Sequence, residues 1–376
     1  MKFIDLFAGI GGFRFGMESA GHECVAFCEI DKFARASYKA IHNTEGEIEL
    51  HDITTVTDDE IRNIGHVDAI CGGFPCQAFS IAGYRRGFED TRGTLFFEIA
   101  RFAAILKPKY LFLENVKGLL NHDKGDTFET ILSALDELGY DVEWQVLNSK
   151  DFRVPQNRER VFIIGHLRGQ RGRKIFPLGG NGATIDCEQP KINKVGNIRK
   201  KGKSQSGDMV SVDSLAPTLC STTTQKSPLK ILLAGNLPGS HEQNGRVYDP
   251  EGISPTLNTM QGGGRQPKIR VREATKKGYA EASVGDSVNL SHPNSKTRRG
   301  RVGEGIANTL VTGDSQGVVT SNFRIRKLTP RECWRLQGFP DWAFDKAQEV
   351  NSNSQLYKQA GNSVTVNVIK EIARYL

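Results

Sequence analysis

The sequence predicts an α/β protein with a doubly wound, mostly parallel sheet in one domain and a second, smaller, irregular β-rich domain. Three observations lead to this prediction. Apolar runs alternate with amphipathic stretches over residues 1–165, a pattern typical of parallel strands covered by helices. Residues 166–322 are instead rich in Gly, Ser, Thr, Asn and Pro and show few helical periods. Residues 323–376 become helical again, so we expect them to complete the first domain.

The elements of the first domain follow in order along the chain. The first strand, "KFIDLF", precedes a glycine turn and a helix through "FRFGMESAG"; the second, "ECVAFCEI", precedes the helix "DKFARASYKAIH". The third strand, "VDAICGG", precedes "TLFFEIARFAAILKP", a helix that Pro108 ends. The fourth, "KYLFLEN", precedes the helix "DTFETILSALDELGY" with Gly139 as its cap. "DVEWQVL" and "ERVFIIGHL" are two further strands, and residues 359–376 contain an amphipathic helix that should pack on this domain.

The composition is that of an ordinary globular protein. The 376 residues are 38% hydrophobic and 25% charged. No segment approaches the roughly 18–20 apolar residues that span a bilayer, and the N-terminus enters a strand at once, so we expect neither a membrane segment nor a signal peptide. Seven cysteines without a CxxC pair predict neither a disulfide framework nor a metal site, and they favour the reducing cytoplasm.

Positive charge is concentrated in the middle of the chain. Residues 166–330 contain 26 Lys and Arg against 12 Asp and Glu, a net charge of +14, whereas the remainder has a net charge of −7. A basic segment inside an acidic chain is typical of a module that binds a polyanion. A solvated basic surface without a partner is the alternative.

The same middle region contains three similar units. Each has a Thr-Leu pair, beginning at Thr218, Thr256 or Thr309, followed by a loop of small residues and an apolar strand with basic residues. The repetition is too irregular for a solenoid and predicts duplicated units that present loops.

The glycine turn "DLFAGIGGF" lies where a ligand meets the carboxyl ends of a parallel sheet. A tight turn without a ligand is the alternative. Glu29 favours the ligand, because an acidic residue about 20 positions beyond such a turn binds ribose hydroxyls. Asp52 is a further polar group, at a loop where an adenine could lie. The spacing lacks the dinucleotide pattern and no "GK[ST]" follows, so S-adenosylmethionine fits best.

Reactive side chains follow the neighbouring strands. "GFPCQAFS" places Cys76 in the loop after the third strand, where an exposed thiolate could act as a nucleophile. Glu114 ends the fourth strand, and "QNRER" places Arg158 and Arg160 two residues apart and therefore on one face. Each has a plain alternative: a buried thiol in a turn, a capping or ion-paired carboxylate, and surface charges. Their convergence on one edge of the sheet favours a catalytic site.

These segments resemble the motifs of bacterial and phage DNA (cytosine-5) methyltransferases. "DLFAGIGGF" is similar to the cofactor motif of that family, "GFPCQAFS" to the nucleophile motif, "ENV" to the acid motif and "QNRER" to the arginine motif. "RKLTPRECWRLQGFP" and "QAGNSVTVNVI" resemble the C-terminal motifs. The resemblance covers residues 1–165 and 323–376, which it makes the catalytic domain, and it makes residues 166–322 the target recognition domain.

The resemblance implies a methyl transfer from S-adenosylmethionine to carbon 5 of a cytosine flipped out of double-stranded DNA, leaving S-adenosylhomocysteine. Cys76 would add to carbon 6, and a protonated Glu114 would donate to ring nitrogen 3. Arg158 would hold the pyrimidine carbonyl, and Arg160 the pocket edge or backbone. Residues at the positions where the family binds cofactor are Phe7, Ala8, Gly9, Ile10, Gly12, Glu29, Ile30, Asp52, Ile53, Gly73, Leu95, Asn362 and Ser363.

The recognition residues are expected in the loops. A lid from Ser80 to Leu95 that includes Arg92 would close over the flipped base, and side chains such as Gln243 and Arg246 suit guanine. The second and third units both match, so either both read DNA or one serves as scaffold. The predicted DNA-contacting residues are Ser80, Arg92, Gln243, Arg246, Tyr248, Thr256, Gly263, Arg301 and Thr309.

The resemblance also implies a cytoplasmic monomer, of cellular or phage origin, that protects DNA from a cognate restriction endonuclease without binding that enzyme. Two other functions stay open at this point. One is methylation of transfer RNA, which the long basic middle region disfavours. The other is a catalytically inactive DNA-binding protein, which the intact set of Cys76, Glu114 and Arg158 disfavours.

Overall fold

The computed structural model describes most of the chain outside its central region. Residues 1–75, 95–170, 173–178, 268–291, 295, 297–313, 315–322 and 324–376 are described with their side chains. The backbone is also described for four short strands, β9 (Lys194–Asn197), β10 (Asp208–Val210), β11 (Leu233–Asn236) and β12 (Arg246–Tyr248).

A seven-stranded sheet in the order β3-β2-β1-β4-β5-β8-β6 forms the centre of the first domain. The β8 strand runs opposite to the other strands of this sheet, which all share one direction, so the prediction of a mostly parallel sheet is confirmed. The strands are β1 (Lys2–Leu6), β2 (Glu23–Cys28), β3 (Ile48–Leu50), β4 (Ala69–Gly73), β5 (Tyr110–Val116), β6 (Tyr140–Asn148) and β8 (Glu159–Leu167).

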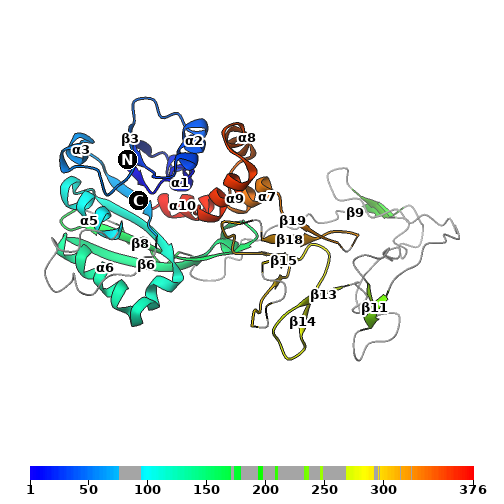
Figure 1. The fold of residues 1–376 in the computed structure, drawn as a ribbon. Coiled ribbons are helices and arrows are strands. Elements are labelled where there is room, and N and C mark those ends of the chain that lie inside the picture. The colour runs from blue at the N-terminus through cyan, green and yellow to red at the C-terminus, as the bar shows by residue number, and fades with distance from the viewer. Residues whose placement is uncertain are drawn as a thin grey trace. The chain divides into compact units, whose positions relative to one another are not determined.

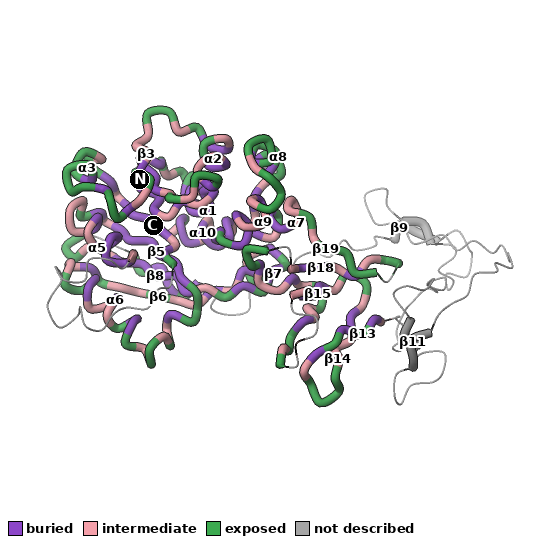
Figure 2. Tube along the Cα trace, viewed as in Figure 1, coloured by how far each residue is buried: buried purple, intermediate pink, exposed green. Residues whose placement is uncertain are grey.

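Helices cover both faces of this sheet because its strands are apolar on both sides (Figures 1 and 2). Ile4 and Leu6 of β1 face a core that includes residues of α3, α5 and α6, whereas Phe3 faces residues of α1 and α10. The helices of this domain are α1 (Gly12–Glu18), α2 (Lys32–Ile41), α3 (Asp58–Asn63), α5 (Leu95–Leu106), α6 (Asp126–Glu137) and α10 (Val366–Ala373).

The C-terminal helix returns to the first domain, as the sequence predicts. In α1, a Cβ atom added at Gly16 would lie 2.4 Å from Cγ2 of Ile369, so the backbone of α1 lies directly against α10. Three more helices precede α10: α7 (Pro330–Leu336), α8 (Asp341–Val350) and α9 (Asn353–Asn362). They pack around the buried ring of Trp334.

Sequence patterns miss the shortest elements. β3 has three residues and no apolar run, and α3 has six. The start of α3 nevertheless has a recognisable signal, since Thr57 and Glu60 form a reciprocal capping box. The 3₁₀ segments η2 (Lys117–Gly125) and η3 (Ser149–Phe152) also lie in stretches for which the sequence predicts no element.

The described part of the second region is β-rich, as expected. Strands β16, β15, β18 and β19 form an antiparallel sheet, and β13 pairs with β14. The β17 strand instead pairs in parallel with β7 (Gln156–Asn157) of the first domain. The strands are β13 (Ile269–Arg272), β14 (Tyr279–Ala282), β15 (Ser287–Asn289), β16 (Val302–Gly303), β17 (Ala307–Asn308), β18 (Gln316–Val319) and β19 (Ile325–Lys327).

By its contacts the chain divides into two compact units, one of Met1–Leu178 with Ile231–Leu376 and one of Gly179–Lys230. The boundaries near residues 165 and 323 stay a prediction. None of the helices in the described part of the chain is long and apolar enough to cross a bilayer.

Candidate active site

The strand order brings the segments that follow β1, β4 and β5 to one edge of the sheet. The chain runs outward from β1 through β2 to β3 and then returns to the other side of β1 as β4. In an α/β sheet, ligands bind at the carboxyl ends of the strands where the direction reverses. The glycine turn follows β1 at this point, and the Phe74–Pro75 segment follows β4.

The glycine turn adopts a backbone that most residues disfavour. Phe7, Gly9 and Gly11 all have positive φ values, of 56°, 57° and 84°. The Gly11 N–H donates to the Ala8 carbonyl at 2.8 Å, which closes the turn before α1 begins at Gly12. The turn therefore presents backbone rather than side chains to the sheet edge, and backbone is what a closely approaching ligand requires.

Glu29 fixes this turn from the next strand. Its Oε2 accepts the Gly9 N–H at 2.8 Å, and its Oε1 accepts the Asp31 N–H at 2.7 Å. Burial raises the pKa of this carboxyl group, and the two N–H donors oppose the rise. Each carboxylate oxygen can accept a further hydrogen bond, so the group keeps the acceptor capacity that ribose hydroxyls need.

Four more of the predicted cofactor residues follow β2 or β3 or begin α5. The Ile30 side chain is 68% exposed beside Glu29. Asp52 accepts the N–H and O–H of Thr54, which lowers the pKa of the Asp52 carboxyl group, and Ile53 is buried next to it. Leu95 begins α5 and is half-buried.

The last of these residues come from the C-terminal motif. A Cβ atom at Gly12 would lie 2.9 Å from Oγ of Ser363 and 2.7 Å from Cγ2 of Val364. Ser363 is buried and its neighbour Asn362 is exposed. The glycine turn near the N-terminus therefore contacts the C-terminal motif.

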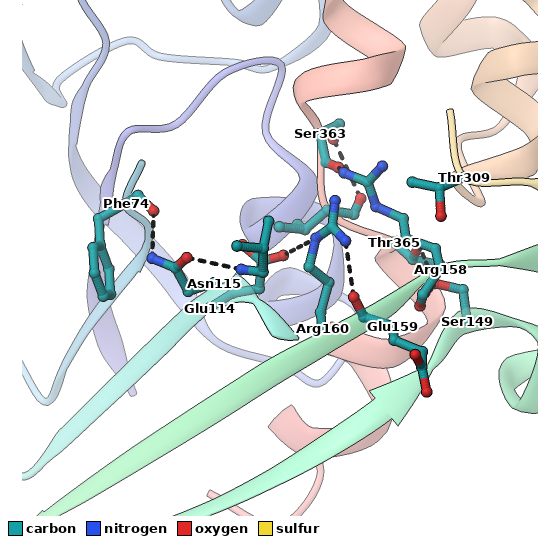
Figure 3. Close-up of polar contacts among 12 residues, drawn as sticks. Phe74, Glu114, Asn115, Ser149, Arg158, Glu159, Arg160, Thr309, Ser363 and Thr365 are labelled. Atoms are coloured by element: carbon teal, nitrogen blue, oxygen red, sulfur yellow. Dashed lines mark hydrogen bonds and ion pairs between the residues drawn. The ribbon is translucent and has the colours of Figure 1, made fainter. Parts of the chain in front are cut away.

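Glu114 lies across the same edge on β5. Its side chain is buried, with a residue exposure of 7%, and its Oε1 lies 2.9 Å from Nε of Arg160 (Figure 3). Burial raises the pKa of the Glu114 carboxyl group, while the Arg160 and Arg158 charges oppose the rise. Gly73 pairs with Glu114 in the sheet, and a Cβ atom there would lie 3.0 Å from Oε2 of Glu114. The missing side chain thus leaves room for the carboxyl group.

Asn115 is a site residue that the sequence reading did not single out, although it belongs to the "ENV" motif. Its Nδ2 donates to the Phe74 carbonyl at 2.8 Å, and its Oδ1 accepts the Val116 N–H at 2.8 Å (Figure 3). The amide therefore fixes the backbone two residues before Cys76. Cys76 itself lies outside the described residues, as do Ser80 and Arg92.

Arg158 occupies a different environment from Arg160. Its Nη1 donates to the Leu310 carbonyl at 3.2 Å, and its Nη2 donates to the carbonyls of Gly361 and Ser363 at 3.1 and 2.8 Å. The residue is 3% exposed, and burial with the nearby Arg160 charge lowers the pKa of the guanidinium to about 9. Only Arg160 has its side chain directed to Glu114 (Figure 3).

The third Thr-Leu unit is attached to the segment that carries Arg158. Hydrogen bonds make this attachment. The Ala307 N–H donates to the Pro155 carbonyl, and Oγ1 of Thr309 donates to the Asn157 carbonyl at 2.7 Å. The Leu310 N–H donates to Oε1 of Gln156 at 3.1 Å. Gln156 Nε2 in turn donates to the Leu336 carbonyl at 2.8 Å. Gln156 belongs to the arginine motif. After Asn115, it is the second residue whose role the sequence reading missed.

The predicted recognition residues are only partly described. The structure does not describe the side chains of the residues predicted in the second unit, nor Gly263. Those side chains belong to Gln243, Arg246, Tyr248 and Thr256. Arg301 is buried, and its guanidinium donates to the carbonyls of Asn289 and Arg272. This use of the Arg301 side chain inside the β-rich region speaks against its predicted contact with DNA. Thr309 is half-buried beside Asn157.

Known proteins resemble the chain over its whole length. The family model described as C-5 cytosine-specific DNA methylase matches residues 1–376. Orphan methyltransferase M.SPRI of Bacillus phage SPR is 35% identical, with 100% of this chain and 97% of the relative covered. Type II methyltransferase M.HhaI of Haemophilus parahaemolyticus is 35% identical, with 99% and 93% covered.

Solved structures share the fold. A putative DNA modification methyltransferase encoded within a prophage, from E. coli, superposes with a TM-score of 0.54 at 20% identity, over 100% of this chain and 97% of that one. Spodoptera frugiperda DNMT2 gives a TM-score of 0.51 at 18% identity, over 98% and 97%.

The two arginines are expected to respond differently to the same conservative change. Arg158→Lys should lower the free energy of unfolding by about 2–4 kcal/mol, because a lysine cannot reach three buried carbonyls in the geometry of a guanidinium. Arg160→Lys should lower it by less than about 1 kcal/mol, since its partner Glu114 can become neutral. Urea denaturation of both variants measures the difference. Equal losses of unfolding free energy would contradict the conclusion that Arg158 contributes more to stability than Arg160.

Proposed function

The chain belongs to the C-5 cytosine-specific DNA methylase family, and from this premise we propose that it methylates a cytosine flipped out of duplex DNA, with S-adenosylmethionine as the methyl donor. The family makes it a DNA (cytosine-5-)-methyltransferase. The observation that carries the proposed mechanism is the buried carboxyl group of Glu114, paired with Arg160 beside the glycine turn.

The residues at the strand reversal fit S-adenosylmethionine. The positive φ values of the turn leave its backbone open to a close ligand, and Glu29 keeps acceptor capacity for ribose hydroxyls. The exposed Ile30 offers an apolar surface to adenine. When bound, the cofactor supplies an electrophilic methyl group. The residues that would hold it are Phe7, Ala8, Gly9, Ile10, Gly12, Glu29, Ile30, Asp52, Ile53, Gly73, Leu95, Asn362 and Ser363.

Carbon 5 of cytosine is a weak nucleophile, so the protein has to activate the ring. In the proposed reaction the Cys76 thiolate adds to carbon 6 while the Glu114 carboxyl group gives its proton to ring nitrogen 3. The resulting enamine is nucleophilic at carbon 5. After methylation, water takes the carbon-5 proton, the electrons of that bond form the carbon 5–carbon 6 double bond, and the Cys76 thiolate leaves carbon 6. The nitrogen-3 proton returns to Glu114. Flipping the base costs a few kcal/mol.

The geometry favours an exchange of the roles first expected for the two arginines. Arg158 already donates to three main-chain carbonyls, so its Nη atoms are engaged. Arg160 lies against Glu114 and is the arginine that can hold the pyrimidine carbonyl. We therefore assign substrate contact to Arg160, and to Arg158 the attachment of the third Thr-Leu unit to the C-terminal motif.

DNA recognition is assigned to the middle region. The third unit is supported by its attachment beside Arg158, and exposed cations such as Arg272 and Arg324 of the same region suit phosphate contacts. Thr309 would contact the backbone near the flipped base. The second unit, with Gln243, Arg246, Tyr248, Thr256 and Gly263, would read a further target, and Ser80 and Arg92 belong to a lid over the base.

The proposal extends to the setting of the reaction. Both type II and orphan methyltransferases occur among the relatives. We propose a cytoplasmic monomer without a bound metal, whose methylation protects DNA against a restriction endonuclease of the same specificity.

Covalent trapping tests the proposed nucleophile. A duplex with 5-fluorocytosine at the target site should form an adduct with the parent protein that survives denaturing electrophoresis, because fluorine cannot leave as the carbon-5 proton does. Cys76→Ser should form no adduct. Cys333→Ser, which changes a buried thiol in α7, should still form it. An adduct on the Cys76→Ser protein would disprove the mechanism, and trapping on substituted transfer RNA alone would identify a different substrate.

The acid role of Glu114 predicts a pH dependence. Glu114 can donate only while protonated, and its pKa is raised, so kcat should fall as pH rises through that raised value. Glu114→Gln should lower kcat by roughly 10²–10⁴-fold and abolish this decline. Methyl incorporation into duplex DNA, measured from acid to alkaline pH, tests both effects. Glu143→Gln serves as the control. Glu143 lies on β6 and bonds His166, so its replacement should leave the dependence of kcat on pH as in the parent.

Methylation mapping tests the two recognition units. Bisulfite sequencing of plasmid from cells that express the protein should reveal a second or an extended motif if both units read DNA. Thr256→Ala should then reduce one class of sites and spare the other. A single short motif in the parent map would reject dual specificity.

A further inference from the structure

His42 lies beneath the glycine turn, although it comes from the end of α2. It is the C-terminal cap of that helix, and its backbone N–H donates to the Tyr38 carbonyl. The imidazole Nε2 lies 3.3 Å from the Ile10 carbonyl oxygen. The ring is 7% exposed as a residue and packs between Phe15 and Tyr38, at centroid distances of 4.8 and 4.6 Å. A polar ring is thus held firmly against the turn.

The imidazole fills the space that Gly11 leaves. A Cβ atom at Gly11 would lie 2.1 Å from Nε2 of His42 and 3.0 Å from two of its ring carbons, distances that real atoms do not adopt. Gly11 is therefore required for two reasons, its φ of 84° and its contact with this ring. The shape of the turn and the position of His42 depend on each other.

The surroundings of the ring keep it neutral. Burial and the nearby Arg14 charge lower the pKa of His42 to about 3. Arg14 is itself fixed by ion pairs with Glu18 and Glu47. A neutral imidazole carries one N–H, and because the Ile10 carbonyl can only accept, that hydrogen belongs on Nε2. The bond then orients the peptide between Ile10 and Gly11.

We propose that His42 is a positioning residue for cofactor binding, which holds the Ile10–Gly11 peptide in the shape that the methyl donor requires. The inference rests on the proposed function, since it assumes that the glycine turn binds S-adenosylmethionine. His42 touches the turn and acts through it, so its loss should weaken cofactor affinity and leave the chemistry and the DNA contacts largely intact.

The chain offers a matched control for a histidine that only supports packing. Nε2 of His22 lies 3.1 Å from the Ala373 carbonyl, so this ring also bonds a buried helix end. It joins the start of β2 to α10 and lies away from the glycine turn. A general loss of stability would appear in both the His42 and the His22 variants. A loss of cofactor affinity should appear in the His42 variant alone.

The first test is calorimetric titration of the full chain with S-adenosylhomocysteine. His42→Ala should raise Kd about tenfold, because it removes a buried hydrogen bond and the wall behind the turn. His42→Gln, whose amide can donate to the Ile10 carbonyl, should keep Kd within about threefold of the parent. His22→Ala should leave Kd unchanged. The KM for S-adenosylmethionine should follow Kd, with kcat at saturation and the Kd for duplex DNA close to the parental values.

The second test uses the mutual dependence of His42 and Gly11. Gly11→Ala alone should weaken binding of S-adenosylhomocysteine severely, because of the clash with the ring and the positive φ. In the His42→Ala background the same change should weaken binding less, since the ring that it strikes is gone. Such non-additivity is typical of residues in direct contact, and hydrogen exchange of the turn amides without ligand supplies a readout independent of the cofactor.

Three outcomes would overturn the proposal. His42→Ala could bind S-adenosylhomocysteine as tightly as the parent while the parent binds it well, which would leave the proposed function intact and make His42 a core residue. Additive effects of Gly11→Ala and His42→Ala would show that the contact does not shape the turn. A parent protein that binds no S-adenosylhomocysteine would refute the cofactor assignment itself, and the positioning role with it.

Discussion

The proposed chemistry depends on one ion pair, between the buried Glu114 carboxyl group and the half-buried Arg160 guanidinium. Burial favours the neutral acid and the neighbouring arginines favour the carboxylate, and the balance leaves the pKa of Glu114 raised. Because its pKa is raised, the carboxyl group holds its proton to higher pH than an exposed glutamate and can release it to a base that binds beside it. The sheet makes the balance possible, because Gly73 of the adjoining strand has no side chain to crowd the carboxyl group.

The same edge of the sheet is also where distant parts of the chain are joined. Arg158 donates to carbonyls of the third Thr-Leu unit and of the C-terminal motif, and Gln156 joins that unit to α7. A buried guanidinium with three oxygen partners is costly to disrupt, since the carbonyls would lose their donors as well. The third Thr-Leu unit is therefore attached to the same short segment that carries Arg160, the arginine paired with Glu114.

The glycine turn is held from three directions. The Glu29 carboxylate accepts the Gly9 N–H, the His42 ring lies against Gly11, and Ser363 and Val364 lie against Gly12. These supports come from β2, α2 and the C-terminal segment, so a turn of strained conformation is stabilised by elements far apart in sequence. Such pre-organisation lowers the ordering that a ligand must impose when it binds.

The sequence by itself determined the α/β fold, the longer strands and helices, and the family. Periodic apolar patterns and the order of motifs can be read along the chain without knowledge of tertiary contacts. It missed β3 and α3, which are too short to show a period. It could not tell which of Arg158 and Arg160 contacts Glu114, because two arginines two residues apart look equivalent, nor show that His42 lies against the glycine turn. Only the tertiary structure decided these points, because a side chain's partners are set by which segments the strand order brings together, and partners rather than residue type determine what a buried charge or ring can do.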